Sequence, residues 1–292
     1  MMEAYYYALG ANFSFALGSI FFTHYARKFS SIWMNTFKAS VAALLFAFTV
    51  LLGSGFHEIS ALNFGIFFVS GFVALGLGDI FLINAFSLIG PGRTLVLFGF
   101  HPMIVGILSY FILGQEVSPK KLIGIIFFIG CLLTFSLESF RKNKSWGVAG
   151  LSMAILGVTL DGVGVIITRY AFDMNTAITA LEGNFHRCLG ALCCYALLNR
   201  FYPMRFVANF REMRLKSKLM VSLGAIFGTY LSLGLYLEAV KTANLAIISS
   251  ISITSVLFSS VFESLWNKEW PSKYLYLGLS FFGVGIWFVM FA

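Results

Sequence analysis

Residues 85–130 read AFSLIGPGRTLVLFGFHPMIVGILSYFILGQEVSPKKLIGIIFFIG and give the clearest sign of the fold of this chain. Pro91 opens an apolar segment, and it suits a first helical turn because its missing N–H would be unpaired there anyway. The polar residues 114–121 end that segment. Ser118 then serves as a helix cap and Pro119 as the next first helical residue. Two apolar helices joined by a short polar turn are therefore predicted.

Apolar segments of this kind recur along nearly the whole chain. Hydrophobic residues make up 59% of the 292 residues and charged residues only 11%, whereas a soluble domain has about 25% charged residues. A run of about 20 apolar residues crosses a bilayer as a helix. The first such run, residues 4–23, lacks a basic region and a cleavage site and is interpreted as a retained helix. The composition therefore predicts an all-α integral membrane protein.

The spans that we expect are separated by short connections. They number ten and cover residues 4–23, 32–52, 63–86, 91–113, 119–138, 147–168, 178–199, 219–239, 243–265 and 273–291.

The two halves of the chain match each other in four places that keep the same order. The offset between matched residues runs from 145 to 154, as a few loop insertions would produce. The matches are Thr23-His-Tyr-Ala26 with Thr168-Arg-Tyr-Ala171, Asn35-Thr-Phe-Lys38 with Asn184-Phe-His-Arg187, Glu116-Val-Ser-Pro-Lys120 with Glu269-Trp-Pro-Ser-Lys273, and Gly124-x-x-Phe127-Phe128 with Gly278-x-x-Phe281-Phe282.

This repetition predicts two five-helix repeats, residues 1–138 and 147–292, joined by a linker over 139–146. Because five is an odd number, the second repeat must enter the membrane in the opposite orientation. Inverted repeats of this kind are typical of secondary transporters, which bind their substrate at the repeat interface near the midplane.

The chain resembles the EamA branch of the drug/metabolite transporter superfamily over essentially its whole length. The resemblance rests on the order of short-looped spans, Gly78-Asp79, the Pro102 span and the Gln115-Glu116 turn. It implies alternating-access transport, and family members move amino acids, nucleotide-type metabolites, quaternary amines or drugs. The family pattern places a proline in both fourth-type helices. Here Ser255 stands where the second proline would be, which argues against symmetric kinks.

Charged residues inside apolar spans are costly and are functional candidates by default. Asn35 and Lys38 share one helix face, and Asn184 and Arg187 share the matching face of the repeat. The two cations could pair with carboxylates such as Asp79, or they could hold an anionic group of a substrate. A structural buried pair that fixes helix register is the alternative.

Two carboxylates, Asp79 and Asp161, lie among glycines that let other helices approach closely. A carboxyl group at this depth can exchange protons, which makes both residues candidates for proton coupling. His101-Pro102 marks a bend inside an apolar span. Pro102 is therefore the predicted hinge, and a packed kink without a functional role is the alternative. Ser252 belongs to a row of hydroxyl groups that could meet a polar ligand or bond helix to helix.

These observations predict a central cavity lined by the first, third, fourth, sixth, eighth and ninth spans. The residues expected to bind substrate there are Asn12, Lys38, Asp79, His101, Asp161, Arg187, Tyr230 and Ser252.

No sequence motif indicates an enzyme, a cofactor or a metal site. The four cysteines, Cys131, Cys188, Cys193 and Cys194, lack metal-ligand spacing and are interpreted as small packing residues. The net charge of +8 comes from basic residues in short connections, which is typical of membrane orientation signals and not of nucleic-acid binding. The leading interpretation is a transporter of a small polar or amphipathic metabolite in a bacterial cytoplasmic membrane, as a monomer or homodimer. A membrane scaffold and a lipid flippase are the alternatives.

The orientation of the termini is a point on which two arguments disagree. The resemblance implies that both termini lie in the cytoplasm. The basic residues indicate the opposite, because cytoplasmic loops normally carry the excess of Lys and Arg. The side of the termini carries Lys120, Lys121, Arg169 and Lys241. The other side carries Arg27, Lys28, Arg93, Arg141, Lys142, Lys144, Arg200, Arg205, Arg211, Arg214, Lys216, Lys218, Lys268 and Lys273.

Overall fold

The computed structural model describes residues 2–116, 118–143, 147–267 and 273–291, and these ranges fold into α-helices, two π-helical segments and short connections. The first half contains α1 (Met2–Lys28), α2 (Ser31–Leu52), α3 (Ala61–Gly71), the π-helix η1 (Phe72–Gly78), α4 (Asp79–Ile89), α5 (Pro91–Phe98), α6 (His101–Leu113) and α7 (Pro119–Asn143). The second half contains α8 (Val148–Met174), α9 (Ala180–Phe201), α10 (Phe206–Glu212), α11 (Leu215–Ala225), the π-helix η2 (Ile226–Leu231), α12 (Ser232–Thr242), α13 (Leu245–Ile251), α14 (Thr254–Asn267) and α15 (Lys273–Phe291).

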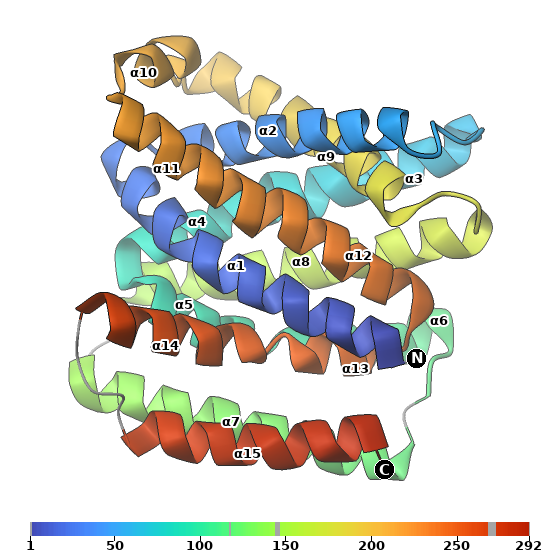
Figure 1. Cartoon of the computed structure of the whole chain (residues 1–292), viewed down its shortest axis with the longest axis vertical. Coiled ribbons are helices and arrows are strands. Elements are labelled where there is room, and N and C mark those ends of the chain that lie inside the picture. Colours follow the sequence, from blue (N-terminus) through green and yellow to red (C-terminus); the bar gives the residue numbers. More distant parts are fainter. Residues whose placement is uncertain (1, 117, 144–146, 268–272, 292) are drawn as a thin grey trace.

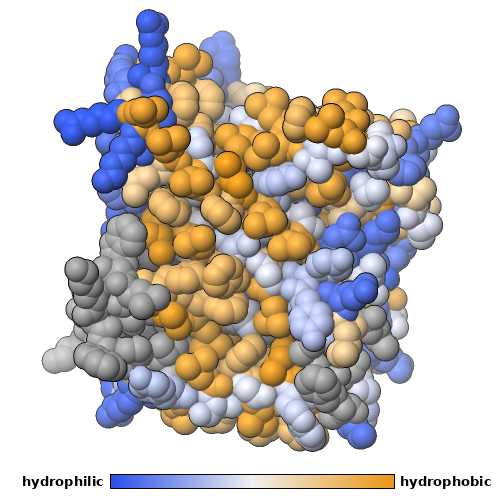
Figure 2. All heavy atoms as spheres, in the orientation of Figure 1, coloured by the Kyte–Doolittle hydropathy of each residue, from blue (hydrophilic) through white to orange (hydrophobic). Residues whose placement is uncertain are grey.

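The predicted all-α class is confirmed, and the helices are compatible with ten spans. Four stretches among the described residues are long and apolar enough to cross a membrane on their own: Ser31–Leu52, Ala61–Ile89, Val148–Met174 and Leu215–Thr242. The helices run roughly side by side, and both ends of the chain lie at the same end of the bundle (Figure 1). Apolar side chains cover most of the face shown in Figure 2. Surface leucines such as Leu44, which is 72% exposed, are suited to lipid contact.

Helix packing repeats between the two halves. In the first half α1 packs against α11, η2 and α12, while in the second half α8 packs against α3, η1 and α4. Corresponding spans also pack against each other: α2 with α9, α7 with α15, and the fourth span with the ninth, where α6 meets α13 and α5 meets α14. In the last pair, Phe127 faces Phe281 with ring centroids 6.2 Å apart, and Phe128 faces Phe282 at 5.9 Å. Residues matched in sequence thus meet each other across the interface between the halves.

Both π-helical segments lie where a neighbouring helix crosses at close range. A Cβ atom on Gly18 of α1 would lie 2.3 Å from Gly228 Cα in η2, and one on Gly164 of α8 would lie 2.3 Å from Ala74 Cβ in η1. Small residues allow this approach. Ser70 adds a polar link, because its hydroxyl donates to Gly164 O over 2.8 Å.

The bend expected at His101-Pro102 within the span 91–113 is a complete break, because the chain turns at residues 99–100 and separates α5 from α6. Helical bonding tightens to three-residue steps there, with Phe100 N bonding to Leu97 O and Met103 N to Phe100 O. Pro102 accounts for part of this break, since it has no N–H to continue the helix.

The expectation that the second half lacks a matching kink is wrong. The chain turns at residues 252–253, between α13 and α14, although no proline is present. Hydroxyl groups explain the break: Ser249 and Ser250 both bond back to Ala246 O, and Ser255 bonds to Ser252 O. Such back-bonding competes with helical hydrogen bonds and bends helices.

Two sequence expectations concern residues outside the described ranges. They are the matched turn at Glu269-Trp-Pro-Ser272 and residues 144–146 of the predicted linker.

The short helix α10, within the basic connection before the eighth span, was not predicted. It is only seven residues long and has no buried residue, so no apolar periodicity marks it.

Candidate functional site: a charged cavity between the halves

A central cavity of about 80 Å³ lies between the two halves of the chain. Both halves contribute: α1, α2, η1, α4, α5 and α6 from the first, and α8, α9, η2, α12 and the turn after α13 from the second. The lining residues are Ala11, Asn12, Phe15, Lys38, Leu75, Asp79, Leu82, Phe98, His101, Asp161, Arg187, Gly228, Thr229, Ser232, Leu233, Tyr236 and Ser252. The second and seventh spans, absent from the predicted lining, supply Lys38 and Arg187.

The structure brings seven of the eight predicted binding residues to this cavity, and Tyr230 is the exception. Its hydroxyl lies 2.7 Å from Thr49 Oγ1, and its ring packs against Phe46 with centroids 4.9 Å apart. Tyr230 belongs to η2, where the wider turn changes which residues face inward. A regular helical period applied to the sequence cannot anticipate that change.

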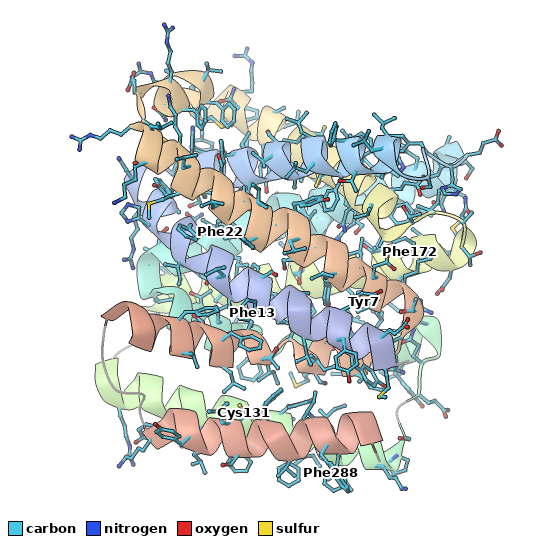
Figure 3. All side chains as sticks on the ribbon, in the orientation of Figure 1. Tyr7, Phe13, Phe22, Cys131, Phe172 and Phe288 are labelled. Carbon is cyan, nitrogen blue, oxygen red and sulfur yellow. The ribbon has the colours of Figure 1, made fainter. Side chains whose placement is uncertain are left out.

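Lys38 and Asp79 form a buried ion pair at the centre of the first half. Lys38 Nζ lies 2.6 Å from Asp79 Oδ2, and the two side chains are 4% and 15% exposed. Lys38 also lies 5.1 Å from the ring centroid of Phe22, which Figure 3 labels on α1. Asn35, one turn before Lys38, donates to Asp79 O over 3.0 Å. Helix α2 therefore holds the start of α4 through both the backbone and the side chain of Asp79.

The matching part of the second half keeps the backbone contact but not the ion pair. Asn184 donates to Leu233 O over 2.8 Å, just as Asn35 does to Asp79 O. Leu233 therefore occupies the position of Asp79, and Arg187 has no carboxylate in the place where Lys38 has one. Arg187 is 1% exposed.

The Arg187 side chain bonds to a neutral group. Its Nε donates to Ser70 Oγ over 3.2 Å, and among the described residues Nη1 has no hydrogen-bond partner although it is buried. Buried side-chain nitrogens rarely go unpaired. The cavity thus contains one neutralised cation and one cation with unused donors.

His101 and Asp161 meet on another wall of the cavity. His101 Nε2 lies 3.1 Å from Asp161 Oδ2, but neither ring nitrogen makes a well-directed hydrogen bond within the described ranges. The His101 ring is 1% exposed and stacks on Phe98 across the break between α5 and α6, with centroids 5.1 Å apart. Asp161 is 24% exposed. The break in the fourth span therefore brings an imidazole to a carboxylate that remains open to the cavity.

Polar residues of the eighth span complete the lining and were not among the predicted binding residues. Thr229, Ser232 and Tyr236 face the cavity, and neither Thr229 Oγ1 nor Tyr236 Oη has a partner among the described residues. A signal was present, because positions three and four residues apart share a helix face. Polar side chains at such spacing within an apolar span could have indicated this wall.

The other buried ionisable residues have structural partners outside the cavity. Glu182 caps α9 in a reciprocal arrangement with Thr179, and it also accepts from His57 N over 2.6 Å. His186 packs edge-on against Phe64, with ring centroids 5.2 Å apart. Within the described ranges no group of three His, Cys, Asp or Glu side chains could hold a metal ion. Cys131, labelled on α7 in Figure 3, is buried and does not line the cavity.

A charged cavity between two related bundles of apolar helices is typical of membrane transporters that are built from two repeated halves. The model of the EamA-like transporter family matches the chain twice, over residues 2–136 and 148–291. The chain belongs to this family, and it is therefore a multi-pass integral membrane protein with the two-repeat transporter fold.

Similar proteins agree with this assignment. A WAT1-related chloroplastic protein of Arabidopsis thaliana is 21% identical over 72% of this chain and 51% of its own length. The uncharacterized transporter YyaM of Bacillus subtilis is 25% identical over 56% of this chain and 53% of its own length. The matches thus span about half the length of these two relatives. A solved crystal structure with 13% identity covers 97% of this chain with a TM-score of 0.71, which shows that the fold is shared.

Proposed function

We propose that this protein is a secondary transporter that moves a small polar or amphipathic metabolite, such as an amino acid or a related compound, by alternating access. The central cavity carries the proposal, because it lies between the halves and collects charged groups that are costly inside a membrane. A scaffold protein would gain nothing from a buried cation with unused hydrogen-bond donors. The proposed location is a bacterial cytoplasmic membrane.

The size of the cavity supports a cycle in which the helices move. Ligand pockets typically measure about 300–1,000 Å³, whereas this cavity measures about 80 Å³. A metabolite would therefore enter only after the helices around the cavity separate. The breaks at residues 99–100 and 252–253 are the proposed bending points, with Pro102 as the hinge of the first half.

Polar contacts join the halves at the end of the bundle where the termini lie (Figure 1). His57, after α2, binds Glu182 at the start of α9, with Nδ1 3.0 Å from Oε2. Leu245 N, at the start of α13, donates to Gln115 Oε1 over 2.9 Å. These contacts would have to break for the cavity to open at this end.

Aromatic rings join the halves at the opposite end. Trp33 Nε1 donates to Phe206 O over 3.2 Å, and Phe37 stacks on Phe210 with centroids 5.3 Å apart. Helix α10 supplies both partner residues, so this helix, which was not predicted, would close the cavity at the end of the protein that carries most basic residues. Alternating access would open the polar and the aromatic closures in turn.

Proton coupling through Asp161 is the finer part of the proposal. Asp161 faces the cavity beside His101, and a neighbouring imidazole can accept or return a proton. Asp79, the other candidate, is tied to Lys38 over 2.6 Å. Asp161 is therefore the better supported of the two coupling candidates.

The proposed function is tested by binding followed by flux. The purified protein is screened for thermal stabilisation across a metabolite panel, because a ligand of the folded state raises the melting temperature. Stabilising compounds are then offered to proteoliposomes containing the protein. We expect protein-dependent uptake of at least one of them. Ligand binding without flux in any direction would contradict the proposal and favour a receptor or scaffold.

A further inference from the structure

The two halves place a cation at the same position but treat it differently. Lys38 has the carboxylate of Asp79 at 2.6 Å, while Arg187 has Leu233 in the matching place. No ion pair joins Arg187 to a carboxylate among the described residues, although Asp161 lines the same cavity. Removing one partner from a buried pair is strongly destabilising. A chain that keeps an unpaired arginine here therefore has a use for its charge.

The local packing fixes where the guanidinium lies. A Cβ atom on Gly71 would lie only 1.9 Å from Arg187 O, so α3 and α9 are in backbone contact at this residue. Ser70, the neighbour of Gly71, donates its hydroxyl to Gly164 O and accepts from Arg187 Nε over 3.2 Å. The side chain is thus anchored at Nε by a neutral group, and Nη1 has unused hydrogen-bonding capacity at the cavity.

Guanidinium chemistry decides which ligand fits this arrangement. Arginine stays charged at all physiological pH values, and its planar fork matches a carboxylate in a two-point contact. Among the described residues no carboxylate forms an ion pair with this buried, anchored guanidinium, although the charges of Asp161 and Asp79 act on it within the same cavity, and its Nη1 keeps unused donors. The small cavity favours a compact anionic group.

We propose that Arg187 binds a carboxylate group of the transported molecule. The inference rests on the proposed transport function and names the chemical group that selects its substrates. Lys38 has no such role, because Asp79 already neutralises it. Recognition of the carboxylate would therefore come from the second half of the chain alone.

Matched pairs of ligands test this inference on the purified full-length protein. The probes are L-threonine with L-threoninamide, L-phenylalanine with L-phenylalaninamide, and succinate with succinamide, together with glycerol 3-phosphate. Thermal stabilisation is measured across a concentration series. We expect at least one carboxylate to stabilise the wild type, while its amide does so at least about tenfold more weakly, as expected for loss of a charged hydrogen bond.

Three variants assign the effect to one residue. Arg187→Gln should weaken carboxylate binding at least about tenfold, and Arg187→Lys, which keeps the charge without the fork, should fall between it and the wild type. Arg211→Gln removes an exposed arginine of α10 and should bind like the wild type. If Arg187→Gln does not fold, Arg187→Lys and the carboxylate–amide comparison decide the question.

The inference is overturned if carboxylates and amides stabilise equally, if no carboxylate stabilises, or if only glycerol 3-phosphate does. It is also overturned if folded Arg187→Gln keeps wild-type affinity. These results leave transport itself standing wherever flux of another compound is measured. Failure of the proposed transport function would look different. Carboxylate binding would still depend on Arg187, but proteoliposomes would take up none of the compounds.

Discussion

At the scale of single residues, the Lys38–Asp79 pair is expected to support the fold more than recognition of the substrate. Asp79→Asn and Lys38→Met should each lower the free energy of unfolding by about 3–5 kcal/mol, because each leaves a buried group without its partner. The double variant Lys38→Met/Asp79→Leu, which copies Leu233 of the second half, should recover most of that loss. Unfolding of the four proteins in one detergent measures the coupling. Effects that simply add would show that the pair is not coupled.

Asp161 is expected to behave differently, because it is partly open to the cavity and beside a histidine. Asp161→Asn should change the free energy of unfolding by less than ~1 kcal/mol, as surface-like substitutions do. It should abolish uptake driven by a pH gradient and spare exchange of substrate across the membrane. Asp173→Asn on the same helix, where Asp173 is 49% exposed, is the matched control. Gradient-driven uptake that survives in Asp161→Asn would remove this residue from proton coupling.

Much of the candidate site could be predicted residue by residue, since charges within apolar spans are rare enough to stand out. Asp79, His101, Asp161 and Arg187 all line the cavity. What could not be predicted is how the charges pair. Asn35 contacts the backbone of Asp79, and Asn184 makes the equivalent contact to Leu233. These contacts align Lys38 with a carboxylate and Arg187 with a leucine, and the alignment is visible only when α2 and α9 are packed in the structure.

At the scale of helices, the crossing of α3 and α9 should tolerate no added atom. Gly71→Ala should destabilise the protein by about 1–3 kcal/mol, the usual effect of overpacking, because its Cβ would meet the Arg187 backbone at 1.9 Å. Gly65→Ala, in the same helix, has open space around the added Cβ and should be neutral or stabilise by up to about 1 kcal/mol. Thermal unfolding of the two variants distinguishes them. Equal effects would mean that the crossing is looser than described.

Helix boundaries were predictable from apolar runs and caps, and so was the bend at His101-Pro102, whereas the interruption that lacks a proline was not. Pro91 and Pro119 begin α5 and α7 as their fixed backbone angle suggests. The turn at residues 252–253 arises instead from serine hydroxyls bonding to nearby carbonyls. The same residue types also occur in unbroken helices, so composition alone gives no signal for a break. The π-helical segments lie where Gly18 and Gly164 bring neighbouring helices close. Such an approach depends on tertiary packing, so composition gives no signal for it either.

At the scale of the whole molecule, the distribution of basic side chains predicts its orientation. Hydrophilic side chains lie at both ends of the bundle in Figure 2, but the basic residues Arg205, Arg211, Arg214, Lys216 and Lys218 cluster in and around α10, at the end away from the chain termini. Because cytoplasmic loops carry the excess of Lys and Arg, we expect both termini to face away from the cytoplasm. A reporter active only in the cytoplasm, fused after Ala292, should give no signal. A strong signal, matched by silence from a fusion within the loop after Phe201, would reverse the orientation.

The repeated architecture was predictable as a whole because the matches between the halves kept one order. The structure places two residue pairs of one match in direct contact, Phe127 with Phe281 and Phe128 with Phe282. Cavity shape was not predictable in the same way, since it depends on the combined side chains of both halves. We propose that this cavity is the path of the substrate.

Cysteine labelling shows whether the substrate passes through the cavity. In a variant without the native cysteines, Asn12→Cys and Ser252→Cys place thiols in the cavity, and Leu44→Cys places one on the 72% exposed outer face of α2. A membrane-impermeant maleimide is applied from each side of oriented membranes. We predict that the cavity thiols react from at least one side, that a transported compound slows the reaction, and that Leu44→Cys stays unlabelled. Cavity thiols that never react from either side, in a protein that still transports, would mean that the substrate takes another path.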